Sequence, residues 1–237
     1  MYFMTKKTIN QNSIYTQELI KTIEPDFSFS NKPINRFKII GSDGNKNNKL
    51  ADLKGRINSI EDCNLRKNSK NLVLGDGNIH SPIMLIGENP GSEEDDLGKV
   101  FQGDVGSLLN KMLLAINIQR DKIYITYALN FRAPEDKKPT SQEIKRYSNF
   151  IKEHISIIDP KIIVLMGSSA MEAITGLNGK ISEERGKWKE VILRNKTYPL
   201  MVTFSPSYLM RFPDKKKYSW EDLKKIKQKI QDLNIEI

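Results

Sequence analysis

The chain has 237 residues, with 38 Lys and Arg against 29 Asp and Glu, so its formal net charge is +9. This length is enough to bury a sizeable core, and it suits one large α/β domain or a domain with an extension, of which we favour a single domain. The excess of basic side chains favours a polyanionic partner such as nucleic acid, and it equally suits a surface that is merely well solvated.

Cys63 is the only cysteine in the sequence. A single thiol excludes a disulfide framework within the chain and any metal site built from several thiolates. No apolar run approaches the roughly 20 residues that cross a membrane, and the first residues lack the positive-then-apolar order of a secretory signal. We therefore expect a cytoplasmic protein without membrane contact, and we expect it to be a monomer.

Residues 1–50 are polar and rich in Asn and Lys, with one short helical pattern at residues 13–23. The stretch GSDGNKNNK near their end is typical of a linker. We expect an extension over residues 1–50 that is partly helical or flexible, and one domain over residues 51–237.

Beyond the extension, short apolar runs alternate with helical patterns. Runs typical of buried strands begin at Ile83, Ile123, Ile162 and Pro199. Helical patterns begin at Val105, at Thr140, where Glu143 is in capping-box register, and at Ser168. The alternation predicts a parallel sheet covered by helices on both faces, with the chemistry in loops at the carboxyl ends of the strands.

The last helical pattern, SWEDLKKIKQKIQDL, has an apolar stripe opposite a face of lysines. The stripe consists of Trp220, Leu223, Ile226, Ile230 and Leu233. This pattern favours a surface helix packed by one face over a specialised DNA-binding helix.

Residues 87–109, GENPGSEEDDLGKVFQGDVGSLL, follow the first strand directly and lead into a helix. Glycines and a proline let backbone N–H groups approach a ligand closely, and a helix start favours an anion or a carbonyl oxygen. The segment has the position of an active-site loop, and the alternative is an ordinary strand-to-helix turn.

This loop resembles the first motif of the type 4 uracil-DNA glycosylases. Further blocks resemble that family in the same order, across roughly residues 50–230: YITYALNFRAP, IDPKIIVLMGSSA, ERGKW and TFSPSYLMRFPDKK. The resemblance implies a three-layer αβα fold with a central four-stranded parallel sheet. It also implies a DNA-repair enzyme of base excision repair, which flips a uracil out of DNA and hydrolyses its N-glycosidic bond.

The resemblance assigns roles in the first motif. Phe101 would stack on the flipped base, the backbone around Glu88 and Asn89 would meet its carbonyl edge, and Glu94 is an acid close to the pocket. The sequence G-x-N-P-G also resembles the mismatch-specific and single-strand-selective glycosylases, in which this asparagine positions the attacking water. The alternative for Asn89 is a turn residue before Pro90.

The second motif would be SPSYLMR, residues 205–211, which the family inserts into the minor groove. Ser207 and Tyr208 would contact DNA, Leu209 would be the wedge driven between base steps, and Arg211 would lie near a phosphate. The alternative for Leu209 is core filling, and for Arg211 it is a solvated face.

The chain departs from the type 4 pattern at the [4Fe–4S] cluster. Three of the four cysteine positions hold Ile60, Phe131 and Tyr147, and Cys63 alone remains. Four thiolates are the usual requirement for such a cluster, so we predict no cluster and no metal, with apolar and aromatic packing in its place.

Two further departures fall on the residues that handle the base. Tyr127 replaces an asparagine whose amide satisfies both O4 and N3–H of uracil, which one phenol does not do in the same geometry. Ser205 replaces a histidine, and as a neutral donor to O2 it predicts a slower enzyme. Asn130 is a second amide that would read the base if the local register is shifted.

Two other functions remain open. A catalytically weak DNA-binding relative would hold bases without cutting, which the changes at Tyr127 and Ser205 favour. A nucleotide-binding protein would use GSSAME as a phosphate turn, but the sequence has no P-loop lysine and no dinucleotide fingerprint.

Overall fold

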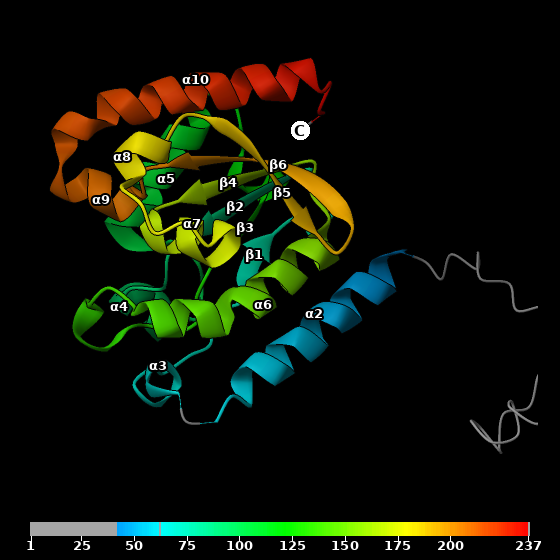
Figure 1. Ribbon diagram of the computed structural model, residues 1–237, viewed down its shortest axis with the longest axis vertical. Coiled ribbons are helices and arrows are strands. Elements are labelled where there is room, and N and C mark those ends of the chain that lie inside the picture. The colour runs from blue at the N-terminus through cyan, green and yellow to red at the C-terminus, as the bar shows by residue number, and fades with distance from the viewer. Residues whose placement is uncertain (1–41, 62, 237) are drawn as a thin grey trace, which may run out of the picture. The chain divides into compact units, whose positions relative to one another are not determined.

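The computed structural model describes residues 42–61 and 63–236, so the helical pattern expected at residues 13–23 lies outside the described part. Within it, one sheet has the strand order β1-β3-β2-β4-β6-β5 (Figure 1). The strands are β1 (Gly75–Gly77), β2 (Ile83–Gly87), β3 (Tyr124–Tyr127), β4 (Ile162–Met166), β5 (Trp188–Leu193) and β6 (Lys196–Thr203). The helices are α2 (Ser42–Asn58), α3 (Asn64–Lys67), α4 (Ser92–Leu97), α5 (Gly103–Leu114), α6 (Ser141–Ile158), α7 (Ser168–Thr175), α8 (Ile181–Glu184), α9 (Pro206–Arg211) and α10 (Lys216–Asp232).

The centre of the sheet is parallel, as predicted. Strand β2 pairs in parallel with β3 and β4, and β4 pairs in parallel with β6. Two antiparallel edge strands, β1 beside β3 and β5 beside β6, complete it. The sequence pattern did not predict these edges, because β1 has three residues of which two are glycines, and β5 is largely half-exposed.

Helices cover both faces of the sheet and make three layers. On one face, α2, α6 and α7 pack on Met84, Ile86 and Ile163. On the other, α5 and α10 pack on Leu85 and Val164. Adjacent strand residues therefore serve opposite cores, because side chains alternate along a strand, and the predicted αβα fold is confirmed.

The stretch that was expected to be a linker forms the first half of helix α2. Leu50, Leu53 and Ile57 are buried on one face of the helix, and Lys46 Nζ donates to the Ile158 carbonyl at the end of α6 at 2.7 Å. The linker interpretation was wrong because polar composition hid a helix that tertiary contacts stabilise. The compact unit spans residues 41–237, and the domain boundary at residue 50 stays a prediction.

The helices predicted at Thr140 and Ser168 begin as expected, whereas α5 and α10 begin at Gly103 and Lys216, shortly before the predicted patterns. At α6, Thr140 Oγ1 accepts from Glu143 N at 3.3 Å while Glu143 Oε2 accepts from Thr140 N at 2.8 Å, which is the expected capping box. In α10 the buried stripe is narrower than predicted, since Trp220 is 43 % exposed and Leu233 is 38 % exposed. No described helix is long and apolar enough to span a membrane.

Aromatic packing surrounds the one cysteine. The Sγ of buried Cys63 lies 3.3 Å from the hydroxyl of Tyr147, whose ring meets Phe131 edge-on at a centroid distance of 6.4 Å. Ile60 packs against the same core. These residues offer one thiolate within close packing, so they do not fit a cluster held by four cysteines.

We therefore expect anaerobically purified protein to lack the visible absorption of an iron–sulfur cluster and to contain no stoichiometric iron. Replacing Cys63 by Ala should leave the spectrum unchanged, because the thiol packs in the core and contacts the Tyr147 hydroxyl without binding a metal. Stoichiometric iron and sulfide that disappear in Cys63→Ala would contradict this.

His154 is a wholly buried titratable group in α6. Its Nε2 lies 2.9 Å from the Tyr124 hydroxyl, and burial lowers the pKa of the imidazole to about 3. The ordinary pKa of histidine in an unfolded chain is about 6.5. Between these values the unfolded chain binds a proton that the folded chain does not bind, so stability falls as pH falls through this window.

Glutamine keeps a hydrogen-bonding side chain but does not titrate. Replacing His154 by Gln should therefore make the free energy of unfolding depend less steeply on pH in this window. Urea denaturation of both proteins between about pH 6 and about pH 4 measures it, and His154 alone adds up to about 1.4 kcal/mol per pH unit to the slope of the unfolding free energy. Equal slopes would show that His154 is not buried in its neutral form.

Candidate active site

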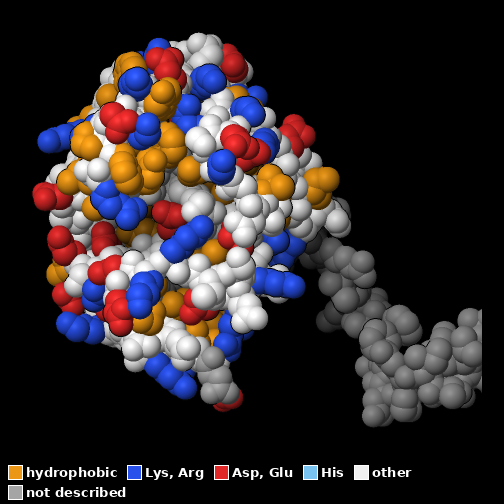
Figure 2. Space-filling model, turned by 60° about the vertical axis from the view of Figure 1, so that its left-hand side comes forward, with side chains coloured by type: hydrophobic (Ala, Val, Ile, Leu, Met, Phe, Trp, Pro, Cys, Tyr) orange, Lys and Arg blue, Asp and Glu red, His pale blue; other side chains and the backbone are white. Residues whose placement is uncertain are grey.

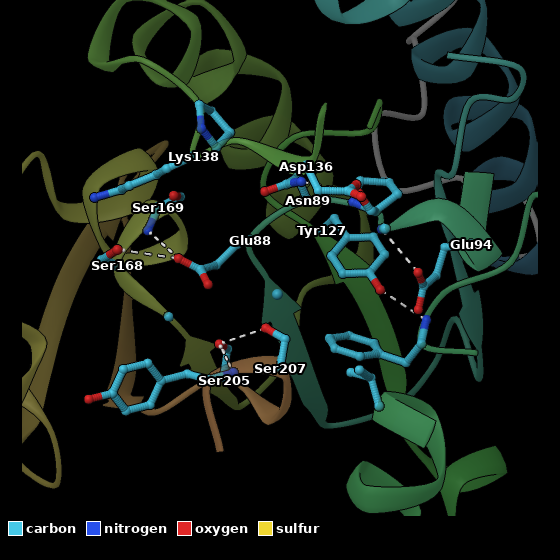
Figure 3. Close-up of a pocket in the computed structure, with 18 of the residues that line it drawn as sticks. Glu88, Asn89, Glu94, Tyr127, Asp136, Lys138, Ser168, Ser169, Ser205 and Ser207 are labelled. Atoms are coloured by element: carbon cyan, nitrogen blue, oxygen red, sulfur yellow. Dashed lines mark hydrogen bonds between the residues drawn. The ribbon is translucent and has the colours of Figure 1, made fainter. Parts of the chain in front are cut away.

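A cavity of about 560 Å³ opens at the edge where the parallel strands end. Figure 2 shows this hollow face, with acidic and basic side chains around its rim. Its walls come from the segments that follow β2, β3, β4 and β6, so residues far apart in sequence meet there (Figure 3). The predicted site residues that line it are Glu88, Asn89, Glu94, Phe101, Tyr127, Ser205, Ser207, Tyr208 and Arg211.

Glu94 holds the first loop in shape. Its carboxylate is buried, with Oε2 accepting from Gly91 N at 3.0 Å and Oε1 accepting from Gln102 N at 2.8 Å. One side chain thereby ties the start of α4 to the start of α5. Both oxygens face backbone donors, so the geometry favours positioning of the loop over proton transfer by Glu94.

Phe101 is fixed by contacts at its backbone. Its φ of +46° is unusual for a residue with a side chain, its N–H donates to the Tyr127 hydroxyl at 3.0 Å, and its carbonyl accepts from Arg120 Nη1 at 3.0 Å. A Cβ at Gly106 would lie 2.0 Å from the same carbonyl, so only glycine fits there. Sequence reasoning missed Arg120, because it lies outside every motif.

Tyr127 lies beside Phe101 as a second ring of the cavity wall. The ring centroids are 4.8 Å apart with planes tilted by 35°, and burial raises the pKa of Tyr127 well above its ordinary value. Its hydroxyl points toward the first loop and accepts from Phe101 N (Figure 3). The neutral phenol therefore presents its ring to the cavity, and its oxygen is engaged by the backbone.

Glu88 and Asn89 follow β2 into the cavity. Glu88 Oε1 accepts from Ser169 N at 3.0 Å and from Ser168 Oγ at 3.3 Å, at the start of α7 (Figure 3). Gly167, directly before α7, has a φ of +108°, which favours glycine, and a Cβ there would meet the Glu88 side chain. Asn89 Nδ2 donates to the Pro90 carbonyl at 3.1 Å, and no described residue donates to its Oδ1.

Ser205 is the N-cap of α9 and faces the cavity. Its Oγ accepts from Tyr208 N at 3.3 Å and lies 3.1 Å from Ser207 Oγ, where either hydroxyl can be the donor (Figure 3). Arg211, one helical turn beyond Ser207, also lines the cavity and is exposed.

Leu209 does not match its predicted role. It is 1 % exposed and packs inside the protein, whereas its neighbour Met210 is 42 % exposed. Leu209 lies on the buried side of α9, which packs against α5. The wedge prediction for Leu209 was wrong, and its core-filling alternative is what the structure shows.

Asn130 is not brought into the cavity. Its side-chain Nδ2 donates to the Val73 carbonyl at 3.0 Å, and its backbone carbonyl accepts from Val73 N at 2.9 Å. The amide is used to hold the segment before β1, so the shifted register that would let it read a base does not occur.

Sequence reasoning missed part of the rim. Asp136, Lys137 and Lys138, in the loop after β3, line the cavity, as do Ser168 and Ser169 at the start of α7. The charged run PEDKKP at the carboxyl end of a predicted strand was the available signal for the first group. The two serines belong to GSSAME, which the sequence analysis considered only as a phosphate turn, and their hydrogen bonds to Glu88 place them in this site.

Comparisons with known proteins agree with this geometry. Residues 74–226 match the family model described as the uracil DNA glycosylase superfamily. The type-4 uracil-DNA glycosylase of Thermotoga maritima is 35 % identical over 157 residues, which cover 66 % of this chain and 80 % of that protein. The type-4 uracil-DNA glycosylase of Archaeoglobus fulgidus is 33 % identical over 181 residues, which cover 75 % and 91 %. This chain therefore belongs to the uracil-DNA glycosylase superfamily.

Proposed function

We propose that this protein is a uracil-DNA glycosylase, which hydrolyses the N-glycosidic bond between uracil and deoxyribose in DNA. The observation that carries the proposal is the convergence of Asn89, Phe101 and Ser205 on one cavity at the carboxyl edge of the sheet. The two relatives named above are type-4 uracil-DNA glycosylases. The net charge of +9 also suits a polyanionic substrate.

The base would enter the cavity after flipping out of the DNA. A cavity of about 560 Å³ has room for a pyrimidine and the adjoining sugar. Phe101 supplies the ring on which the base stacks. Its backbone is already held at the N–H and at the carbonyl, so Phe101 loses little conformational entropy when the base binds. Backbone around Glu88 and Asn89 meets the carbonyl edge, while Arg211 and Lys138 lie at the rim for the phosphates.

Asn89 would position the attacking water. Its Oδ1 is left to accept a hydrogen bond from that water, since its Nδ2 already donates to Pro90. A neutral amide suffices because the transition state resembles an oxocarbenium ion, in which departure of the base carries most of the barrier.

Ser205 would stabilise the departing base. When Ser207 donates to Ser205 Oγ, which also accepts from Tyr208 N, the hydrogen of Ser205 is free to reach O2 of uracil. Negative charge grows on that oxygen as the bond breaks, so a donor aimed at it lowers the barrier. A serine donor is neutral, which fits a slower enzyme than one with a histidine.

Base selectivity would be broad, because the Tyr127 hydroxyl is engaged by Phe101 N and does not read O4 or N3–H. The same feature favours a second candidate, a DNA-binding relative that holds bases without cutting. The expected cytoplasmic location and monomeric state remain predictions.

Replacing Asn89 by Ala should lower the rate of uracil release by about 100-fold or more, because the water loses its acceptor. Labelled oligonucleotides with one uracil, single-stranded or opposite G or A, followed by alkaline cleavage of abasic sites, measure this. Replacing the exposed Asn45 of α2 by Ala is the matched control and should change nothing. Salt-sensitive binding without release from any substrate would instead establish the non-cutting relative.

Replacing Ser205 by Ala should lower kcat by about 100-fold with a small effect on KM, since the donor acts mainly in the transition state. Replacing it by Asn keeps both a donor and a helix cap, so Ser205→Asn should keep more of the rate than Ser205→Ala. An unchanged kcat in Ser205→Ala would remove this residue from the mechanism.

A further inference from the structure

A ladder of three rings runs along α9 from the core to the surface. Phe204 and Tyr208 are stacked, with centroids 4.9 Å apart and planes 20° apart, and Tyr208 and Phe212 follow at 4.8 Å and 39°. Tyr208 lies within α9, while Phe204 precedes the helix and Phe212 follows it, and the ring contacts bring the three side chains into one row. Phe204 is buried, Tyr208 is half-buried, and Phe212 is 46 % exposed, so the ladder ends in an accessible ring.

The ring ladder is continuous with the candidate active site. Phe204 and Tyr208 line the cavity, and Phe212 comes directly after Arg211, which also lines it. A strand of DNA whose uracil occupies the cavity would therefore pass the exposed ring with a neighbouring nucleotide.

The inner end of the ladder is held firmly. The guanidinium of Arg185 lies 5.5 Å from the centre of the Phe204 ring, and its Nε donates to Asp222 at 3.0 Å. Asp222 is fully buried in α10 and accepts from Thr203 Oγ1 at 2.7 Å, directly before Phe204. A braced ring loses little entropy when a flat group stacks on the ladder.

Cations and further apolar side chains surround the outer end. Tyr218 is 40 % exposed, with Lys217 Nζ 5.1 Å from its ring centre, and Met210 and Arg211, which precede Phe212 in the chain, are also exposed. The carboxylate of Asp214 is the acid among them and pairs with Lys215 at 2.8 Å. Figure 2 shows hydrophobic side chains gathered beside the hollow with basic side chains among them. Rings interleaved with cations are the chemistry that binds single-stranded nucleic acid.

We propose that the ring ladder is a stacking platform for an unpaired base next to the flipped uracil, which makes single-stranded DNA the favoured substrate. This proposal rests on the proposed function. In a duplex the base next to the flipped uracil stays held by pairing and by stacking on its other neighbour, whereas a base of an unpaired strand is free to turn onto an exposed ring. The burial of Leu209 points the same way, because the predicted wedge is not available to fill the gap that flipping leaves in a duplex.

The test measures binding with oligonucleotides that carry one 2′-fluoro-deoxyuridine, single-stranded or opposite G. The fluorine disfavours an oxocarbenium-like transition state, so the probe is not cleaved during the measurement. By fluorescence anisotropy, replacing Phe212 by Ala should weaken binding to the single strand about 10-fold and to the duplex less than about 2-fold. Phe212→Trp should retain single-strand binding, because it keeps an aromatic face.

Replacing Trp220 by Ala is the matched control, since this ring is 43 % exposed on α10 and belongs to no part of the ladder. It should change neither affinity. Equal loss on both probes, loss on the duplex alone, or no loss in Phe212→Ala would each overturn the platform; loss on the duplex alone would mark Phe212 or Met210 as a wedge.

The binding result is separate from cleavage. Phe212→Ala could lose affinity for the single strand alone while the wild-type protein releases no uracil. That result would support the stacking platform and reject the proposed glycosylase activity. Uracil release with no single-strand effect of Phe212→Ala would keep the glycosylase and reject the platform.

Discussion

Parallel hydrogen bonding between β3, β2, β4 and β6 determines where everything else in this protein lies. The pairing places Gly87 beside Tyr127 and Met166 beside Thr203, so the four strands end at nearly the same level. Each following segment then starts from the same edge, and the cavity forms between them. An antiparallel arrangement of the same strands would have sent half of these segments to the opposite edge.

Partly buried polar contacts then turn that edge into a defined site. The carboxylates of Glu94 and Glu88 accept backbone N–H groups, and Arg120 holds the carbonyl of Phe101. These groups lie between the strand ends and the cavity, so they limit how far the loops move when a ligand enters. Such support is what gives a site its geometry before the substrate arrives.

Aromatic side chains stand at two places where the family resemblance implies other groups, a base-reading amide at one and cluster cysteines at the other. The resemblance implies an amide at position 127 that reads a base edge. Tyr127 instead accepts a hydrogen bond from Phe101 N and contacts the Phe101 ring. Tyr147 and Phe131 close around Cys63 where a cluster would need thiolates. At both places packing and a single hydrogen bond supply local order.

The four parallel strands, the capping box at Thr140 and most of the cavity wall could be predicted from the sequence, because apolar periodicity, cap chemistry and motifs are readable along the chain. Other features depended on contacts that form only in the folded protein. Leu209 turned inward with the rotation of α9, Asn130 went to Val73, and α2 formed from a polar stretch. In each case the deciding partner lies far along the chain, and only the folded structure brings it within hydrogen-bond or packing distance.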